Sequence, residues 1–194
     1  ERATTPLHAG ASSRLAQAPA RHAMNRRAVA IIVTMSGIVL IVLPSVVGAP
    51  RLLLWNNSAS VPIGLYAVLP PRVLHVGDVA VVVPPDPLAA ALAARGSLPS
   101  GVPLIKPIAA LAGQTICRHG LHITIDGAVV GAARARDHRG RPLPAWMGCR
   151  TLGSHDVFLM NPAAPDSFDG RYFGSLPVSS VVGRATPLWV PKEY

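Results

Sequence analysis

The sequence predicts a mainly β domain that follows a single N-terminal transmembrane helix. Three observations lead to this fold class. The run at residues 28–50 contains no charged residue. Beyond it, short apolar runs are separated by Pro and Gly, which end strands and form turns. Only one stretch of this second part has the composition of a helix. A hydrophobic content of 50% excludes a disordered chain.

Residues 1–27 are basic and are expected to be disordered. They carry five Arg against one Glu, a net charge of +4, among Ala, Ser, Thr and Pro. Met24 is the first Met and opens the sequence Met-Asn-Arg-Arg, which is typical of a natural start. Residues 1–23 are therefore interpreted either as a processed stub or as an upstream extension, and the sequence leaves both open.

Residues 28–50 are predicted to form a transmembrane anchor. A bilayer core of about 30 Å requires about 20 apolar residues in a helix. The alternatives are a cleaved secretory signal, whose apolar core usually has about 7–15 residues, and a buried core helix. The N-terminal Arg residues precede the run, which favours a cytoplasmic N-terminus. In a bacterium with two membranes, a single-pass protein of the inner membrane then places residues 51–194 in the periplasm.

Residues 51–194 supply the predicted β domain. Its apolar runs predict strands at 79–83, 121–125, 128–130, 157–160 and 181–185. Asp126-Gly127 is a hairpin-type turn between the second and third of these strands. The sequence DPLAAALAAR predicts one short helix over Asp86–Arg95, with Asp86 as the N-cap and Pro87 at the first helical position.

Cys117 and Cys149 are the two cysteines of the chain. The oxidising periplasm favours a disulfide between them, which would close a loop of about 30 residues and add on the order of 3 kcal/mol of stability. Two unpaired thiols are the alternative. His119 and His122 raise the question of zinc, but ligands along one alternating strand would face both sides of the sheet. No metal and no other cofactor is expected.

The formal net charge of +9 does not indicate nucleic-acid binding. Residues 51–194 carry a net charge of +5, and the excess is scattered apart from one cluster, which comprises Arg134, Arg136, Arg139 and Arg141. The cluster lacks the aromatic platforms that bind single strands, so it is interpreted as a solvated loop. The chain also lacks the P-loop, H-E-x-x-H, G-x-S-x-G and S-x-x-K motifs.

Lys106 stands out because lysine is rare in this chain. The chain has 16 Arg but only two Lys, and Lys106 lies in the apolar stretch 102–109. Lysine can lose its proton in a protein, whereas arginine cannot, and apolar surroundings lower the pKa of an ammonium group. A base at neutral pH needs a drop of about three pKa units, or about 4 kcal/mol. The alternative is a surface lysine beside a strand.

Two polar segments are further candidates for chemistry. Residues 56–66 place Ser58 and Ser60 just beyond the anchor, where a serine nucleophile would need a base to take its proton. A polar linker is the alternative for this segment. Residues 165–174 combine polar, aromatic and Gly residues, and Asp169 and Arg171 are spaced for an ion pair. A plain loop with a turn is the alternative here.

Four motifs in a fixed order carry a resemblance to a known family. They are N-x-S-x-S-x-P-x-G-L-Y at residues 56–66, Lys106 after an apolar run, D-x-x-G-R-P-L-P at 137–144, and S-F-D-G-R-Y-F-G at 167–174. Together they resemble the TraF-type peptidases of conjugative transfer systems, a branch of the signal peptidase I superfamily of Ser/Lys proteases. The likeness runs from the anchor to Trp189 and implies a signal-peptidase-like β domain.

The resemblance implies roles for six residues. Ser60 matches the nucleophile and Lys106 the general base, while Ser58 matches a hydroxyl that helps the Ser60 backbone N–H to form the oxyanion hole. The remaining three match supporting residues: Ser167 as the partner of the lysine amine, and Asp169 and Arg171 as a structural pair.

Two departures from general signal peptidases concern the neighbours of these residues. General enzymes carry Ser-Met-x-Pro, whereas here Val61 replaces Met and Pro62 comes one position earlier. This difference points toward the TraF branch and away from housekeeping secretion. Pro107 stands where the general pattern has Arg after the lysine.

The function implied by the resemblance is that of a membrane-anchored serine endopeptidase. Such an enzyme would process a pilin-type precursor after small residues for conjugative transfer or type IV secretion, and some members cyclise the pilin. Its implied partners are the precursor, the lipid bilayer beneath an apolar face, and other mating-pair-formation proteins, but no nucleic acid. The alternatives are a general type I signal peptidase and a non-catalytic anchored β-module of a secretion complex.

Overall fold

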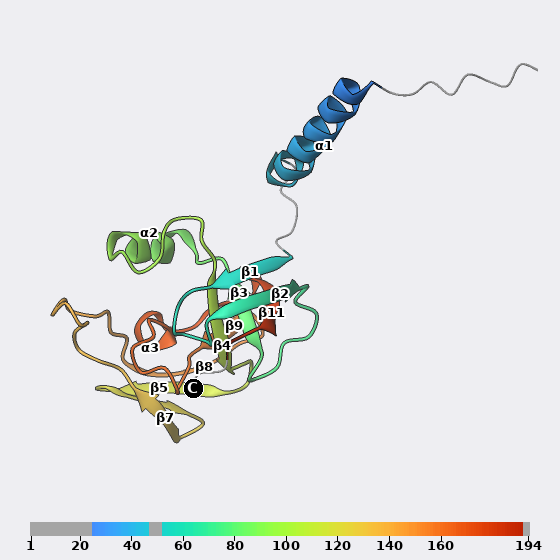
Figure 1. Ribbon diagram of the computed structural model, residues 1–194. Helices are drawn as coiled ribbons and strands as arrows, with labels where there is room; N and C mark the ends of the chain where they lie inside the picture. Colours follow the sequence, from blue (N-terminus) through green and yellow to red (C-terminus); the bar gives the residue numbers. More distant parts are fainter. Residues whose placement is uncertain (1–24, 47–51, 192–194) are drawn as a thin grey trace, which may run out of the picture. The chain divides into compact units, whose positions relative to one another are not determined.

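The computed structural model describes residues 25–46 and 52–191 (Figure 1). The chain divides into two compact units, Glu1–Ala49 and Pro50–Tyr194. The predicted disorder of residues 1–24, together with the start at Met24, lies outside the described residues. The described part of the first unit is a single helix, and the described part of the second contains all the strands.

Helix α1 spans Arg26–Val46 and begins two residues before the predicted run. The Asn25 side chain accepts a hydrogen bond from the Arg27 N–H at 3.1 Å, which satisfies one of the free donors of the first turn. The apolar side chains of α1 are mostly exposed, including Leu40 and Ile41. Residues Arg26–Leu43 form a helix long and apolar enough to cross a membrane, a property that an anchor shares with a signal sequence.

Two antiparallel sheets form the second unit. The larger sheet has the order β1-β2-β11-β3-β4-β9-β10. Its strands are β1 Leu53–Asn56, β2 Gly64–Leu69, β3 Val79–Val82, β4 Leu104–Ala110, β9 Asp156–Leu159, β10 Leu176–Pro177 and β11 Val181–Trp189. The smaller sheet has the order β7-β6-β5-β8. Its strands are β5 Thr115–His119, β6 His122–Ile125, β7 Ala128–Ala132 and β8 Gly148–Thr151.

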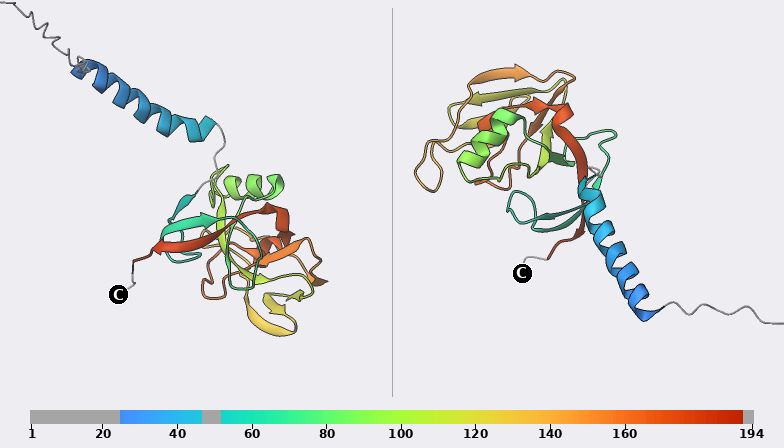
Figure 2. Two further views of the ribbon diagram at one scale, coloured as in Figure 1. Left: turned by 90° about the vertical axis from the view of Figure 1, so that its right-hand side faces the viewer. Right: turned by 90° about the horizontal axis from the view of Figure 1, so that it is seen from above.

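Helices are few in this unit, so the predicted mainly β class is confirmed. They are α2 Asp86–Ala94, α3 Gly170–Phe173 and the 3₁₀ turn η1 Val178–Ser180. The two views of Figure 2 place the small sheet at the far end of the unit from β1 and β2.

Alternation along the central strands divides the core between the faces of the larger sheet. Ala80 and Val82 of β3 belong to one buried cluster, which Leu92 of α2 covers, whereas Val81 belongs to a cluster on the other face with Tyr66. A third cluster includes Ile116 and Ile123 of the small sheet, and Ala110, Phe158 and Met160. The core therefore spans both sheets, and β4 and β9 contribute to more than one cluster.

Most of the predicted strands, and the predicted hairpin turn, are present in the structure. Strands form at 79–82, 122–125 and 156–159, and the hairpin turns at Asp126-Gly127, where both residues have positive φ (50° and 83°). Two positive φ angles match the type I′ turn that this dipeptide favours. The last predicted strand is longer than expected, because β11 continues to Trp189 through a register shift.

The predicted N-cap of α2 is wrong. Pro85 holds the cap position and no side chain bonds there, while Asp86 lies in the first helical turn. An acidic residue in the first turn still favours the helix, because its charge complements the helix dipole.

Candidate active site

Strand alternation places Lys106 on an apolar face. In β4, Lys106 lies opposite Ala80 of β3, between Leu104 and Ile108, which belong to the same buried cluster. The Lys106 residue is only 4% exposed. Burial lowers its pKa to about 8; the charge of Asp169 opposes this shift, and that of Arg171 adds to it. The amine is therefore far closer to neutrality at physiological pH than a surface lysine.

Ser60 and Ser167 both meet the Lys106 amine. Lys106 Nζ donates hydrogen bonds to Ser60 Oγ and, at 2.6 Å, to Ser167 Oγ. Ser167 Oγ in turn donates to Ser60 Oγ at 3.3 Å. The three polar heads thus form a triangle, although they come from positions 46 and 61 residues away from the lysine. A lysine in this position can accept the Ser60 proton when it is neutral.

The turn that carries Ser60 joins β1 to β2 and is held by side chains of those strands. Asn56 Nδ2 donates to the carbonyls of Ser58, Val61 and Pro62 at 2.8, 3.0 and 3.1 Å. The Tyr66 hydroxyl also donates to the Pro62 carbonyl, at 2.6 Å. Asn56 and Tyr66 are both buried. The motif contained both residues at fixed distances from Ser60, but no role was assigned to them from the sequence.

Ser58 lies two residues before Ser60 and is exposed. Its backbone N–H and its hydroxyl both bond to Asn56 Oδ1, at 3.1 and 3.0 Å. The Ser58 hydroxyl is therefore committed to Asn56 in this structure, and an oxyanion role would require it to rotate toward the substrate.

Asp169 and Arg171 form a buried ion pair beside the lysine. Arg171 Nη2 and Nε contact the two Asp169 oxygens at 2.8 and 2.9 Å, and the side chains are 0% and 1% exposed. Asp169 also caps α3 by accepting the Arg171 N–H. The guanidinium bonds further to the carbonyls of Ala164 (2.6 Å) and Ser167 (3.3 Å). The pair thereby fixes the backbone that presents Ser167.

A groove of about 1200 Å³ runs past these side chains. One wall is formed by residues 53–60, and the other by residues 101–106 before and within β4. Leu98 and Phe168 also line it. β1 is an outer strand in the order of the larger sheet. An outer strand beside a groove is an arrangement to which an extended peptide can add as a further strand.

The motif at 137–144 lies away from the Ser60 and Lys106 side chains. Asp137 pairs with Arg95 at the end of α2 (3.2 Å) and with Arg141 (2.8 Å). Desolvation raises the pKa of Asp137, but the hydrogen bonds from the Arg141 backbone and side chain and from Arg139 outweigh it and hold the pKa at about 2. This motif thus fastens a loop to α2.

Cys117 of β5 and Cys149 of β8 face each other directly and form a disulfide. The expectation that His119 and His122 alternate along one strand is wrong, because a turn at Gly120 places them opposite each other on β5 and β6. Among the described residues, Cys117, His119 and Cys149 have potential ligand atoms within 4.8 Å of one another. Both sulfur atoms are committed to the disulfide.

Comparisons with known proteins give a consistent result. The family model described as signal peptidase, peptidase S26, matches residues 25–190. A probable conjugal transfer protein TraF from Sinorhizobium fredii is 35% identical over 140 residues, which cover 67% of this chain and 73% of that protein. The conjugal transfer protein TraF of Agrobacterium fabrum is 34% identical over 178 residues, 86% of this chain and 98% of its own.

A solved structure gives a weaker match. The signal peptidase I of Enterococcus faecalis superposes with a TM-score of 0.37 at 19% identity, over 59% of this chain and 98% of its own. A superposition at this level adds nothing to the match with the family model.

Proposed function

Because the chain belongs to the signal peptidase family, peptidase S26, as a TraF-type member, we propose that it is a membrane-anchored serine endopeptidase with a Ser60/Lys106 dyad. Its substrate is a pilin-type precursor processed for conjugative transfer or type IV secretion. The conjugal transfer proteins among its relatives support this substrate class over that of a general signal peptidase.

The observation that carries the proposal is the contact of a buried lysine amine with the Ser60 hydroxyl. In the first step, neutral Lys106 takes the Ser60 proton as Oγ attacks the scissile carbonyl carbon. The Ser60 N–H donates to the oxyanion that forms, and the Ser58 hydroxyl donates to it after rotating away from Asn56 Oδ1. Lys106 then gives its proton to the leaving amine, and an acyl ester remains on Ser60.

The acyl ester is resolved by a second nucleophile. Attack by water, with Lys106 again accepting a proton, gives a linear product and frees Ser60. Attack by an amine of the substrate gives a new amide bond, and a terminal amine of the same chain gives a cyclic product. Ser167 holds the Lys106 amine in place through both steps, since its hydroxyl accepts from Nζ.

The precursor binds in the groove as an extended segment. Among the described residues, β1 is the outer strand of the larger sheet and offers its edge for backbone pairing, while the residues that line the groove would contact the side chains of the bound segment. Small side chains next to the scissile bond allow the peptide backbone to approach Ser60 closely. Other mating-pair-formation proteins would deliver the precursor or receive the product.

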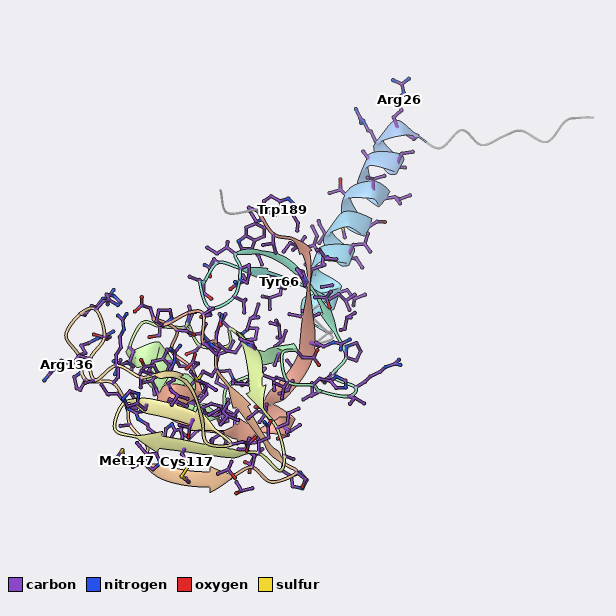
Figure 3. The ribbon with its side chains drawn as sticks, turned by 90° about the horizontal axis from the view of Figure 1, so that it is seen from below. Arg26, Tyr66, Cys117, Arg136, Met147 and Trp189 are labelled. Atoms are coloured by element: carbon purple, nitrogen blue, oxygen red, sulfur yellow. A yellow bond between two sulfur atoms is a disulfide. The ribbon has the colours of Figure 1, made fainter. Side chains whose placement is uncertain are left out.

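An aromatic patch supports contact between the second unit and a lipid surface. Trp55 and Trp189 stack with their ring centroids 5.7 Å apart, and both are more than half exposed. Leu53 lies two residues before Trp55 in β1, on the same face of the strand, and is also more than half exposed. Figure 3 shows Trp189 at the opposite end of this unit from Cys117. Exposed Trp beside Leu suits the membrane–water interface.

The proposed location is the inner membrane of a bacterium, with α1 as a single-pass anchor. The Arg residues before and at the start of α1 support a cytoplasmic N-terminus. This orientation places the second unit, with the groove and the disulfide, in the oxidising periplasm.

Coexpression with a candidate pilin precursor tests the function, with intact-mass analysis of the product. We expect a cleaved product with the wild-type chain and uncleaved precursor with Ser60→Ala and with Lys106→Met. Ser179→Ala, a change at an exposed serine, and Lys192→Met, a change of the other lysine, serve as matched controls that keep activity. Cleavage by the Ser60→Ala or Lys106→Met protein would exclude the dyad.

A further inference from the structure

Asn161, a residue distant in the sequence, contacts the backbone of the proposed nucleophile. It lies 101 residues from Ser60, just beyond β9, and its Nδ2 donates to the Ser60 carbonyl at 2.7 Å. Its Oδ1 accepts the N–H of Ala163 at 3.0 Å. We propose that Asn161 is a positioning residue that sets Ser60 against Lys106. This role rests on the proposed dyad.

The backbone of Asn161 is itself fixed by the buried ion pair. Its N–H donates to Asp169 Oδ2 at 3.2 Å, and its carbonyl accepts from Arg171 Nη2 at 3.4 Å. Asp169 and Arg171 are almost fully buried. The Asn161 amide therefore projects from a rigid base, which allows it to define a position for Ser60.

The same short segment is also tied to the strand that carries the lysine. The N–H of Met160, the residue before Asn161, donates to the carbonyl of Pro107 at 3.1 Å. Pro107 directly follows Lys106 in β4. Two consecutive residues thus bond to the neighbour of the proposed base and to the backbone of the proposed nucleophile. Residues 160–161 act as a bridge between the two halves of the dyad.

The other side chains that hold the Ser60 turn cannot perform this task. Asn56 and Tyr66 belong to β1 and β2, the strands that the turn joins. They fix the shape of the turn, but they move with it. Asn161 instead relates the turn to β4 and β9. Proton transfer between Ser60 and Lys106 depends on this relation, and a misplacement of about 1 Å can cost about 10²-fold in rate.

Two substitutions separate positioning from a merely structural role. Asn161→Asp keeps an oxygen for the Ala163 N–H but loses the donor to the Ser60 carbonyl. Asn161→Ala loses both hydrogen bonds. Gln114→Ala is the matched control, because Gln114 also uses one donor and one acceptor, bonding Asp126 and Leu111 at 3.0 Å each within the second unit.

Steady-state cleavage of a precursor peptide, normalised to folded protein, is the first readout. For Asn161→Ala we expect kcat to fall about 10- to 100-fold while KM stays within about twofold. The midpoint of its pH–rate profile should not move, because no charge changes. For Asn161→Asp we expect a similar loss and a higher midpoint, because the added carboxylate favours the Lys106 ammonium. Gln114→Ala should match the wild type.

Crystal structures of the wild-type and Asn161→Asp proteins give a second readout that needs no activity. We expect Ser60 Oγ to lie beyond hydrogen-bond distance of Lys106 Nζ in the variant alone. An unchanged contact, wild-type kcat in both variants, or a rate loss that matches the loss of folded protein would overturn the positioning role. If the wild type shows no Ser60-dependent cleavage, the proposed function fails, and the two crystal structures still decide whether Asn161 positions Ser60.

Discussion

At the scale of single residues, the proposed chemistry depends on the burial of one amine. Lys106 is surrounded by apolar side chains of β3 and β4, and burial lowers its pKa to about 8. Its hydrogen bonds to Ser60 and Ser167 orient the amine within this apolar setting. A lysine that loses its proton near physiological pH can serve as a general base, which a surface lysine cannot do efficiently.

The lowered pKa predicts a pH dependence of the rate. The base must be neutral to accept the Ser60 proton, and Lys106 becomes neutral as the pH rises through its pKa of about 8. We therefore expect kcat to increase from pH 6 and to level off above pH 9, with a midpoint near 8. Single-turnover cleavage of a precursor peptide across this pH range measures how the rate depends on pH. A flat rate from pH 5 to 9 would contradict a lysine base.

The same burial predicts a cost in stability. The pKa of Lys106 is about 8 in the folded chain and 10.5 in the unfolded reference, so only the unfolded chain holds this proton between those values. The free energy of unfolding should therefore rise with pH between about 8 and 10.5. Below pH 8, the buried ammonium should lower the free energy of unfolding by on the order of 3 kcal/mol.

Substitution of the lysine tests this penalty. Lys106→Met fills the site with an apolar chain, so we expect it to be more stable than the wild type at pH 7 and to converge with it near pH 10.5. Urea unfolding of both proteins at several pH values measures the difference. A constant difference between pH 7 and pH 10.5 would show that the amine is not buried as described.

At the scale of elements, the short segment from Asn161 to α3 organises the site. Asp169 caps α3, and the Arg171 guanidinium binds the carbonyls that precede it. The alternative prediction for residues 165–174 is a loop, and most of the segment does lack regular structure. Its rigidity comes from the buried ion pair instead of from a helix or a strand.

The buried pair predicts an unequal effect of two arginine substitutions. Arg171→Ala leaves Asp169 buried without its partner, so we expect a loss of about 3–5 kcal/mol in the free energy of unfolding. Arg134 pairs with Asp166 at the surface, where both side chains are more than half exposed, so Arg134→Ala should cost less than about 1 kcal/mol. Urea unfolding compares them, and equal losses would contradict the structural role of the buried pair.

Elements with local signals were predictable, and elements without them were not. The hairpin over residues 122–132 follows from Asp126-Gly127, because that dipeptide favours the required positive φ angles by itself. Strand β4 was missed, since Pro107 interrupts its pattern, and the strand is stabilised by its pairing with β3 and β9 and by the burial of its side chains. Pro85 displaced the expected cap of α2, a difference of one residue that composition does not resolve.

At the scale of the whole molecule, the site exists only through long-range contacts. Ser60, Lys106 and Ser167 come from three separate parts of the chain, and their meeting depends on the order of the larger sheet. The apolar stretch around Lys106 indicated a possible base, but only the resemblance in motif order indicated that Ser60 and Ser167 act with it. Asn161 could not be found in this way, because its bond to the Ser60 carbonyl is visible only once β9 is placed beside β4.

The most direct test of the proposed chemistry is to trap the acyl ester. The wild-type protein is mixed with a precursor peptide and quenched in acid within the first turnover, and the adduct is located by peptide mass mapping. We expect the acyl group on Ser60, and we expect no adduct with Ser60→Ala or Lys106→Met. An adduct on another residue, or cleavage by the Ser60→Ala protein, would contradict the role of Ser60 as the nucleophile.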